Sequence, residues 1–364
     1  MGKRILYIEP FDGGSHAAFT RTLTEGVEAD WTALTLPGRH WKWRARGSAV
    51  YLVQRHGDAL SQPYDLIVAG SFLPLSDLLA LVPPLAAVPS VLYFHENQLA
   101  YPVQGGAKER DFHYGFSQMV SALAATRCVF NSQWNLESFI AEGRALLRRM
   151  PDARPPGWME AIEAKSLVIP VPLELPDTAP IIHDAAELGR SGPTILWNHR
   201  WEYDKAPQDF FAALEVLASR QTPFKVIVCG ERFSKAPEAF ETAREWLGDR
   251  ILHWGWADSR RDYLDLLASA DIAVSTAIHE FFGVSMLEAT HFGAHPLVPD
   301  RLSYPELFPA EHRYKDVGDL VSKLEALCAR WQTGQPLRAD RRHLTGPYIH
   351  RPLERFGELF DALT

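Results

Sequence analysis

Two glutamates on either side of a glycine are the residues whose spacing most suggests chemistry. They enclose the segment Glu280-Phe-Phe-Gly-Val-Ser-Met-Leu-Glu288, which follows a buried-strand pattern at 271–276. If a helix begins near Gly283, Glu280 lies in the loop before it and Glu288 lies a turn or more inside. The free amides at the start of such a helix, together with the positive end of its dipole, favour an anion.

The two carboxylates complement such an anion site. Glu280 can accept hydrogen bonds from sugar hydroxyls beside the anion, and Glu288 can hold the two vicinal hydroxyls of a ribose. A nucleotide sugar contains all three of these parts. For two glutamates at this spacing alone, a solvated helix without a binding role is the more frequent explanation. The choice between that helix and a nucleotide-sugar site therefore depends on motifs elsewhere in the chain.

Two cations follow a second strand pattern. Arg200 and Lys205 come after the apolar run that ends at Trp197. A guanidinium fork and an ammonium point charge can together clamp a diphosphate whose negative charge grows as it leaves. The alternative is a surface salt-bridge network in which Arg200 and Lys205 pair with Glu202 and Asp204. His199 lies in the same segment.

Two glycine pairs in the second half follow further strand patterns. Gly230 precedes Glu231, and Gly255 precedes Trp256. Each glycine leaves room for a nucleotide base to approach the backbone, although either pair alone is a weak signal.

Polar residues also follow strand patterns in the first half. Gly13, Gly14 and His16 open a helix after the first strand, but the full Gly-x-Gly-x-x-Gly fingerprint is absent, so a dehydrogenase is poorly supported. The turn Gly13-Gly14-Ser15 is also expected to serve as the N-cap of that helix. A polar cluster, His95-Glu96-Asn97-Gln98, follows a later strand, and a buried histidine with satisfied hydrogen bonds is the alternative reading of His95.

Short apolar runs alternate with helix-like segments along the whole chain. Continuous apolar runs indicate strands covered on both faces, and therefore parallel sheets. Strands are predicted at 5–8, 65–69, 90–94, 127–130, 166–169, 193–197, 225–229, 251–254, 272–275 and 295–298. Helices are predicted at 17–26, 209–220, 237–247, 262–268 and 349–363. This α/β pattern predicts two doubly wound, Rossmann-like domains with ligands at the carboxyl ends of the strands.

The domain boundaries follow from length and proline content. With 364 residues the chain suits two domains. We predict an acceptor-side domain at 1–175, a proline-rich linker at 176–192 and a nucleotide-sugar-binding domain at 193–345. The remaining segment, 346–364, holds a helix with no strand after it, and we expect this helix to pack back on the first domain.

Composition narrows the class of protein. Three widely spaced cysteines show neither a disulfide framework nor zinc-ligand spacing, so we expect a reducing, cytoplasmic location. No Asp-x-Asp triplet occurs, so a metal-chelated diphosphate is not indicated, and the two cations would replace the metal. The long uncharged run at 78–94 contains three prolines and is too short to cross a bilayer, so no membrane association is expected.

One segment of the first half is basic and aromatic. The net charge of −8 argues against a protein wholly wrapped in nucleic acid, but no acidic residue occurs from Trp31 to Gly57. If residues 41–46 are extended, they would place cations on one face and aromatics on the other. The alternative is a solvated basic loop with two tryptophans in the core. The relevant side chains are Arg39, Trp41, Lys42, Trp43, Arg44, Arg46 and Arg55.

These motifs resemble the retaining glycosyltransferases of the two-domain GT-B type, family 4. Within that family the chain is similar to the tRNA-queuosine α-mannosyltransferases over about residues 5–310. The blocks that carry this resemblance are His40-Trp-Lys-Trp-Arg-Ala-Arg46, Tyr93-Phe-His-Glu-Asn-Gln-Leu99, Tyr101-Pro-Val103, Glu109-Arg-Asp-Phe112, His199-Arg-Trp-Glu-Tyr-Asp-Lys205 and His279-Glu-Phe-Phe-Gly283. The linker and the C-terminal tail carry no recognisable match.

The resemblance implies a cleft between the two domains, GDP-mannose as donor, no metal or other cofactor, and queuosine in a tRNA anticodon loop as acceptor. It implies catalytic roles for Arg200, Lys205, Glu280 and His95. The donor contacts would come from Gly13, Gly14, His199, Glu231, Trp256, Phe281, Phe282, Gly283, Val284 and Glu288. The tRNA contacts would come from His16, Lys42, Arg44, Arg46, Glu96 and Asn97.

Two other functions remain open from the residues alone. A GT-B transferase with another nucleotide sugar, or with a saccharide or lipid acceptor, would share all the donor residues. A non-catalytic RNA- or sugar-binding module on the same scaffold is the second alternative, but such a module has no need of a complete diphosphate clamp.

Overall fold

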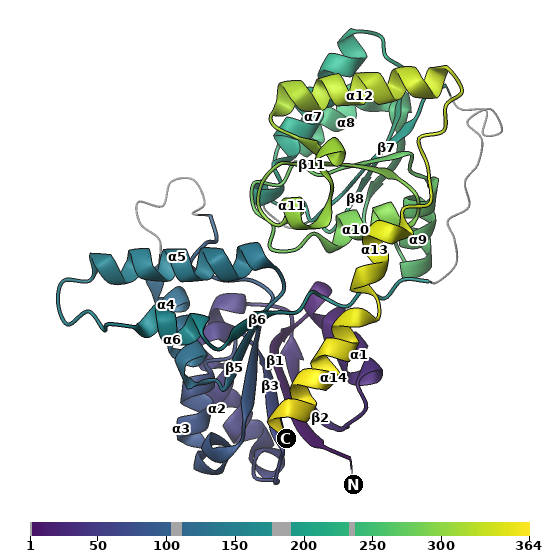
Figure 1. Cartoon of the computed structure of the whole chain (residues 1–364). Helices are drawn as coiled ribbons and strands as arrows, with labels where there is room; N and C mark the ends of the chain where they lie inside the picture. Colours follow the sequence, from purple (N-terminus) through teal and green to yellow (C-terminus); the bar gives the residue numbers. More distant parts are fainter. Residues whose placement is uncertain (1, 103–110, 177–190, 233–236) are drawn as a thin grey trace. The chain divides into compact units, whose positions relative to one another are not determined.

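The chain folds into two compact units (Figure 1). The computed structural model describes residues 2–102, 111–176, 191–232 and 237–364. We call residues 1–174 with 348–364 the N-terminal unit and residues 175–347 the C-terminal unit. Most of the predicted linker, 176–192, lies outside the described residues.

The N-terminal unit is built on six strands in the order β2-β1-β3-β4-β5-β6, and each neighbouring pair is parallel. The strands are β1 (Arg4–Asp12), β2 (Asp30–Pro37), β3 (Leu66–Gly70), β4 (Ser90–Phe94), β5 (Arg127–Phe130) and β6 (Ser166–Val168). The helices are α1 (Ser15–Gly26), α2 (Trp41–Leu60), α3 (Leu75–Leu81), α4 (Phe112–Ala124), α5 (Gln133–Arg149), α6 (Trp158–Glu163) and α14 (Arg351–Leu363).

The C-terminal unit repeats this plan with the strand order β12-β11-β10-β7-β8-β9, again with parallel neighbours. The strands are β7 (Thr194–Asn198), β8 (Lys225–Cys229), β9 (Ile251–Gly255), β10 (Ile272–Val274), β11 (His295–Pro299) and β12 (Arg313–Tyr314). The helices are α7 (Pro207–Ser219), α8 (Ala239–Leu247), α9 (Arg260–Ser269), α10 (Val284–His291), α11 (Tyr304–Leu307), α12 (Val317–Gln332) and α13 (Arg342–Thr345). The predicted α/β class with parallel sheets is confirmed.

Both sheets reverse their winding at one place. In the N-terminal unit the chain moves from β1 outward to β2 and then returns to place β3 on the other side of β1. In the C-terminal unit β8 and β9 extend from one side of β7, and β10 lies on its other side. Open α/β sheets bind ligands at the carboxyl ends of the strands beside such a switch point. The β1/β3 and β7/β10 junctions are therefore the expected ligand positions.

Two strands and one helix differ from the sequence-based predictions. β2 and β12 were missed, because β2 is a partly buried edge strand without a continuous apolar run and β12 has two residues. Residues 41–46 of the basic aromatic segment are not extended. They form the start of α2, so their side chains follow helical spacing instead of strand alternation. The N-cap of α1 is Gly14, which lies within the predicted turn Gly13-Gly14-Ser15.

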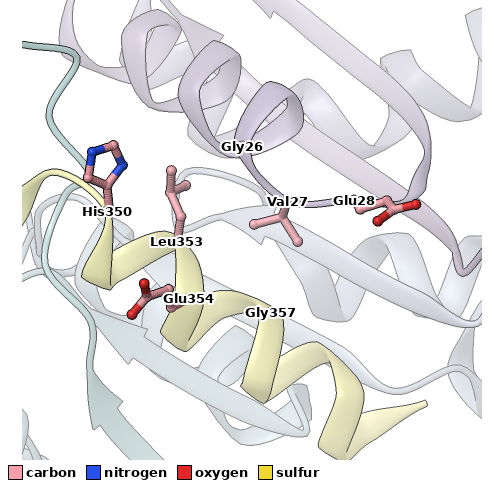
Figure 2. Close-up of a pocket in the computed structure, with 7 residues that line it drawn as sticks. All are labelled: Gly26, Val27, Glu28, His350, Leu353, Glu354 and Gly357. Carbon is pink, nitrogen blue, oxygen red and sulfur yellow. The ribbon is translucent and has the colours of Figure 1, made fainter. Parts of the chain in front are cut away.

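The C-terminal helix α14 packs on the N-terminal unit beside α1 (Figure 1). Its buried side chains Pro352, Phe356 and Phe360 recur every fourth residue and so form one face. Gly26 allows α14 to approach α1 closely, because a Cβ on Gly26 would lie 2.6 Å from a methyl group of Leu353. A groove between the two helices is lined by Gly26, Val27, Glu28, His350, Leu353, Glu354 and Gly357 (Figure 2). Among the described residues, no helix is long and apolar enough to cross a membrane.

Candidate active site

The loop from β10 to α10 places Glu280 before a helix start at the β7/β10 junction. α10 begins at Val284 with Gly283 as its N-cap, as predicted. Gly283 has a φ of 115°, and a Cβ there would lie 3.1 Å from the Tyr304 ring, so glycine fits best. Glu288 lies on the second turn of the helix. The arrangement of loop, helix start and two carboxylates is therefore present in the folded chain.

Lys205 is buried among oxygen atoms. Its Nζ donates to the backbone oxygen of His279 at 2.8 Å and lies 3.2 Å from Asp204 and 3.3 Å from Glu280. Burial lowers the pKa of Lys205, but Glu280 and Asp204 outweigh it and raise that pKa. Burial raises the pKa of Glu280, but the charge of Lys205, together with the hydrogen bond from the Phe282 amide, outweighs it and lowers that pKa. Both groups are therefore charged at neutral pH.

Arg200 lies in the same β7–α7 connection but is half-exposed, with Nη2 3.1 Å from Glu202. Lys205 ends the short helix Tyr203–Lys205 of this connection. The salt bridges considered as an alternative thus exist, since each cation pairs with a carboxylate. They differ in kind, because the Arg200 pair is open to solvent and the Lys205 cluster is not. An exposed pair is held weakly, so a diphosphate can displace Glu202 from Arg200 at little cost.

Glu288 is held by two residues that the sequence analysis missed. Its Oε1 accepts from Arg260 Nη2 at 2.8 Å, and its Oε2 accepts from the Tyr263 hydroxyl at 2.7 Å. Asn198 donates to the same Tyr263 oxygen at 3.1 Å. Arg260 and Tyr263 are three positions apart at the start of α9, which puts them on one helix face. That spacing, in the first turn of the helix that follows β9, is the signal that could have found them.

His199 is a buried histidine directly after β7. Its Nδ1 lies 3.3 Å from Ser285 Oγ, and within the described residues its Nε2 has no hydrogen-bond partner. Burial, and then the charge of Lys205, lower its pKa from 6.5 to about 4. The ring is therefore neutral at pH 7 and keeps one nitrogen for a ligand.

The depressed pKa of His199 predicts that acid destabilises the protein. Between pH 6.5 and about 4 the unfolded chain binds a proton that the folded His199 does not, so the free energy of unfolding falls as pH falls. We expect His199→Asn to show a shallower decrease in urea unfolding experiments at pH 7, 5.5 and 4.5. His295, whose pKa is lowered to about 3, also makes the free energy of unfolding fall as pH falls. Part of this pH dependence therefore remains in His199→Asn. An identical pH dependence in the variant would contradict this role.

The other predicted donor contacts lie around the same edge of the C-terminal unit. Trp256 follows β9 and is 66% exposed, and Glu231 is exposed after β8. Val284 is the first residue of α10. Phe281 and Phe282 are buried, and the Phe282 amide donates to Glu280 Oε1 at 3.4 Å. That amide thus orients Glu280, and the role of Phe282 as a donor contact stays a prediction.

Three buried side chains meet at the β1/β3 junction of the N-terminal unit. Glu9 Oε2 lies 3.4 Å from His16 Nδ1 and 3.8 Å from His95 Nε2. The two imidazole rings are 4.0 Å apart. The sequence analysis named both histidines and missed Glu9. The available signal was a carboxylate directly after the apolar run of β1, where packing alone does not require one.

The glycines before α1 shape the same edge of the sheet. Gly14 has a φ of 54° and is exposed at the helix start. At Gly13 a Cβ would lie 3.0 Å from the Cα of Gly38, so the two backbones meet there.

The polar cluster after β4 divides into different environments. Glu96 is partly buried and accepts from Gln98 Nε2 at 2.9 Å. Asn97 has no exposed surface, and its amide bonds to Asn135 at 2.8 Å, to Ser138 at 3.1 Å and to the Ala100 amide at 2.7 Å. Asn97 is therefore a structural residue of this loop, which corrects its assignment to the tRNA contacts.

The start of α2 presents cations and aromatic rings together. Lys42 and Arg46 are exposed, Arg44 is partly buried, and Trp43 is 65% exposed. The Arg46 guanidinium lies 4.9 Å from the Tyr114 ring. The alternative that buried both tryptophans in the core is therefore wrong for Trp43. A helix start with exposed cations and an exposed aromatic suits an anionic polymer that contains bases.

Comparisons with known proteins show matches to two families and to a relative of known name. The family described as "tRNA-queuosine alpha-mannosyltransferase N-terminal" matches residues 4–173, and the family "Glycosyl transferases group 1" matches residues 180–325. The tRNA-queuosine alpha-mannosyltransferase of Drosophila melanogaster is 40% identical over 331 residues, which cover 89% of this chain and 86% of the relative.

Solved structures share the fold at low identity. Sucrose-phosphate synthase from Thermosynechococcus elongatus superposes with a TM-score of 0.68 at 16% identity, covering 99% of both chains. The Anabaena protein HepE, in complex with UDP and glucose, gives a TM-score of 0.67 at 14% identity, covering 99% of this chain and all of that one. Together with the two parallel sheets, these neighbours confirm the GT-B fold.

Proposed function

The chain belongs to the family of tRNA-queuosine alpha-mannosyltransferases, and we propose that it transfers mannose from GDP-mannose to the cyclopentenediol of queuosine in a tRNA anticodon loop. The observation that carries this proposal is the relative that is 40% identical over 89% of the chain. The donor-side geometry supports it, because a charged Lys205–Glu280 pair stands beside a helix start. We place the protein in the cytoplasm, which suits its three free cysteines.

The C-terminal unit would bind the donor in four places. The diphosphate would lie between Arg200 and Lys205 at the start of α10, without a metal ion. Glu280 would accept hydrogen bonds from the sugar hydroxyls. Glu288, whose oxygens have lone pairs left after bonding Arg260 and Tyr263, would accept from the ribose. The exposed Trp256 offers a stacking surface for the guanine base.

The reaction retains the anomeric configuration and needs no carboxylate nucleophile. The acceptor oxygen bonds to the anomeric carbon on the face from which the diphosphate leaves, and the leaving phosphate takes the hydroxyl proton. Arg200 and Lys205 would supply most of the rate acceleration, because the leaving group is more negative in the transition state than in the ground state. His95 would contact hydroxyls of the donor sugar.

The start of α2 would bind the tRNA backbone through Lys42, Arg44 and Arg46. Replacing all three with Ala is expected to weaken tRNA binding and to reduce its salt dependence by about two to three units of slope, depending on whether the contacts are single-stranded or duplex-like. Ala favours helices, so α2 should persist. Binding measured between 50 and 300 mM salt would test this, with GDP affinity unchanged.

A matched control removes the same charge from the C-terminal unit, with Arg220, Lys323 and Arg330 replaced by Ala. Its salt slope should equal that of the wild type. An unchanged slope in the α2 variant would move the RNA path to the basic stretches at 144–154 or 338–351.

The transfer itself can be tested with purified protein. Incubation with a queuosine-containing tRNA and GDP-mannose should yield a nucleoside heavier by one hexose in mass spectrometry, and a tRNA with guanosine at that position should yield none. Parallel reactions with GDP-glucose, UDP-glucose and UDP-galactose would test the donor. Equal transfer from another donor would refute the GDP-mannose assignment and leave the acceptor assignment standing.

A further inference from the structure

A tryptophan on the solvent side of α2 lies against its own helix. Trp43 is 65% exposed, while Ala49 and Leu52 on the other side of α2 are buried in the core. At Gly47, one turn after Trp43, a Cβ would lie 3.0, 3.1 and 3.2 Å from three carbons of the indole ring. Because these distances are nearly equal, the Cβ would meet a face of the ring and not its edge. One face of the indole therefore lies on the helix at Gly47, and the other is directed to solvent.

Gly47 is better explained by the position of this ring than by the fold of α2. Glycine in a helix interior is less favourable than alanine. Gly47 has helical backbone angles, since within α2 only His56 departs from them, so no turn or cap requires a glycine here. The three atoms nearest to a Cβ at Gly47 all belong to the Trp43 ring. The missing Cβ thus leaves room for the indole to lie flat.

The surroundings of the Trp43 ring are basic and apolar. Lys42 and Arg46, one position before and three positions after Trp43, are both exposed, and no acidic residue occurs from 31 to 57. Val50 and Tyr51, which are 50% and 46% exposed, continue the apolar surface along the helix. With a rise of about 1.5 Å per residue, Tyr51 lies about 12 Å from Trp43 along the axis. A flat exposed ring between cations complements a nucleic-acid base and its neighbouring phosphates.

The start of α2 lies near the ligand edge of the N-terminal sheet. The Trp41 ring is 5.9 Å from that of Phe72, which follows β3, and the Phe72 ring is 5.8 Å from that of His16 in the first turn of α1. Both contacts lie within the N-terminal unit. The β1/β3 junction, where a doubly wound sheet binds its ligand, is therefore linked to α2 by a continuous row of rings.

We propose that Trp43, with its ring placed by Gly47, stacks on an unpaired base of the tRNA anticodon loop, close to the nucleoside that receives mannose. This inference rests on the proposed function. It adds a contact with a base to the phosphate contacts of Lys42, Arg44 and Arg46. Stacking releases no counterions, so the affinity that Trp43 contributes does not depend on salt. Stacking also requires a base outside a duplex, so Trp43 favours a loop over paired RNA.

The first test measures binding of an anticodon stem–loop that carries queuosine. Trp43→Ala should lower the affinity about tenfold, within the range for the loss of one stacked base, and Trp43→Phe should keep most of it. The slope of affinity against salt between 50 and 300 mM should be unchanged, in contrast to the variant that lacks the three cations. The affinity of Trp43→Ala for a fully paired RNA duplex should equal that of the wild type.

A control for this test removes an exposed apolar side chain elsewhere in the same unit. Leu81 ends α3 and is 48% exposed. Leu81→Ala should leave the affinity for the stem–loop unchanged.

A second variant separates stacking from folding. Gly47→Ala should leave the melting temperature unchanged or raise it, because alanine favours the helix. The affinity for the stem–loop should nevertheless fall about threefold or more, because the added Cβ displaces the indole ring. Gly357→Ala on α14 is the matched control, since a Cβ there has no other atom within 4 Å. It should make the same change in helix propensity without any change in affinity.

Each contrary outcome has a separate meaning. Normal stem–loop affinity in Trp43→Ala or in Gly47→Ala, or an equal loss for the loop and the duplex, overturns the inference alone while the wild type transfers mannose. Absence of transfer by the wild type overturns the proposed function and, with it, the place beside queuosine. A wild-type dimer that Trp43→Ala converts to a monomer in sedimentation would assign this face to a second copy of the chain. Binding to phosphatidylserine vesicles that only Trp43→Ala loses would assign it to a membrane surface, and either result would overturn the stacking role.

Discussion

Replacing Lys205 with methionine is expected to lower kcat about a hundredfold or more and to destabilise the C-terminal unit. Catalysis falls because one preorganised charge at the diphosphate is lost. Stability falls because Asp204 and Glu280, which both contact Lys205 Nζ, keep their charges in a buried site without a cation. Removing one partner of a buried ion pair costs about 3–5 kcal/mol. Steady-state kinetics and urea unfolding would measure the two effects.

Arg200→Gln is the matched control for this prediction. Its side chain is 49% exposed and pairs with Glu202 at the surface, so the free energy of unfolding should change by less than about 1 kcal/mol. Its kcat should nevertheless fall about a hundredfold, since it grips the same leaving group. Full activity in both variants would place the diphosphate elsewhere. Equal destabilisation in both would contradict the buried cluster around Lys205.

Replacing Glu280 with glutamine is expected to lower the rate of transfer more than about tenfold, equivalent to at least ~1.4 kcal/mol of barrier. The carboxylate accepts from the Phe282 amide with Oε1 and contacts Lys205 with Oε2. An amide is a poorer acceptor for sugar hydroxyls, and its NH₂ group is repelled by Lys205. Affinities for GDP and for tRNA should stay the same, as isothermal titration and filter binding would show.

Glu325→Gln provides a control for Glu280→Gln in the same unit. Glu325 lies on α12, where it accepts from Arg220 at 2.7 Å at the surface. Its replacement should leave the rate of transfer unchanged. If Glu280→Gln keeps more than about a tenth of the wild-type kcat, its carboxylate does not bind the sugar in the transition state.

The donor-side residues were found from sequence because their signals are local. Glu280, Gly283 and Glu288 lie within one loop and one helix, and Arg200 and Lys205 lie within one connection. Their roles as donor contacts stay predictions that the variants above test. The sequence analysis missed Glu9, Arg260 and Tyr263, because each contacts a site residue that is distant from it in the sequence. Glu288, for example, is held by residues 25 and 28 positions away.

The basic segment shows where local reasoning fails. Its composition indicated a contact with nucleic acid under either secondary structure, but the strand alternation considered for residues 41–46 does not occur, because they are helical. Helix and strand spacing are hard to separate in a stretch with few apolar residues. The exposure of Trp43 and the contact of Arg46 with Tyr114 follow from the position of α2 beside α4.

The sequence by itself determined the α/β class, the parallel sheets and the family, because apolar runs and motifs are local patterns along the chain. Residues that follow different strands could be expected near one another, because parallel strands bring their carboxyl ends to one edge of the sheet. Tertiary structure alone decided which charges meet. It buried Lys205 between two carboxylates, left Arg200 in solvent, enclosed Asn97, and set Glu9 against two histidines. These outcomes depend on desolvation and on contacts between distant segments, which exist only after the sheets have formed.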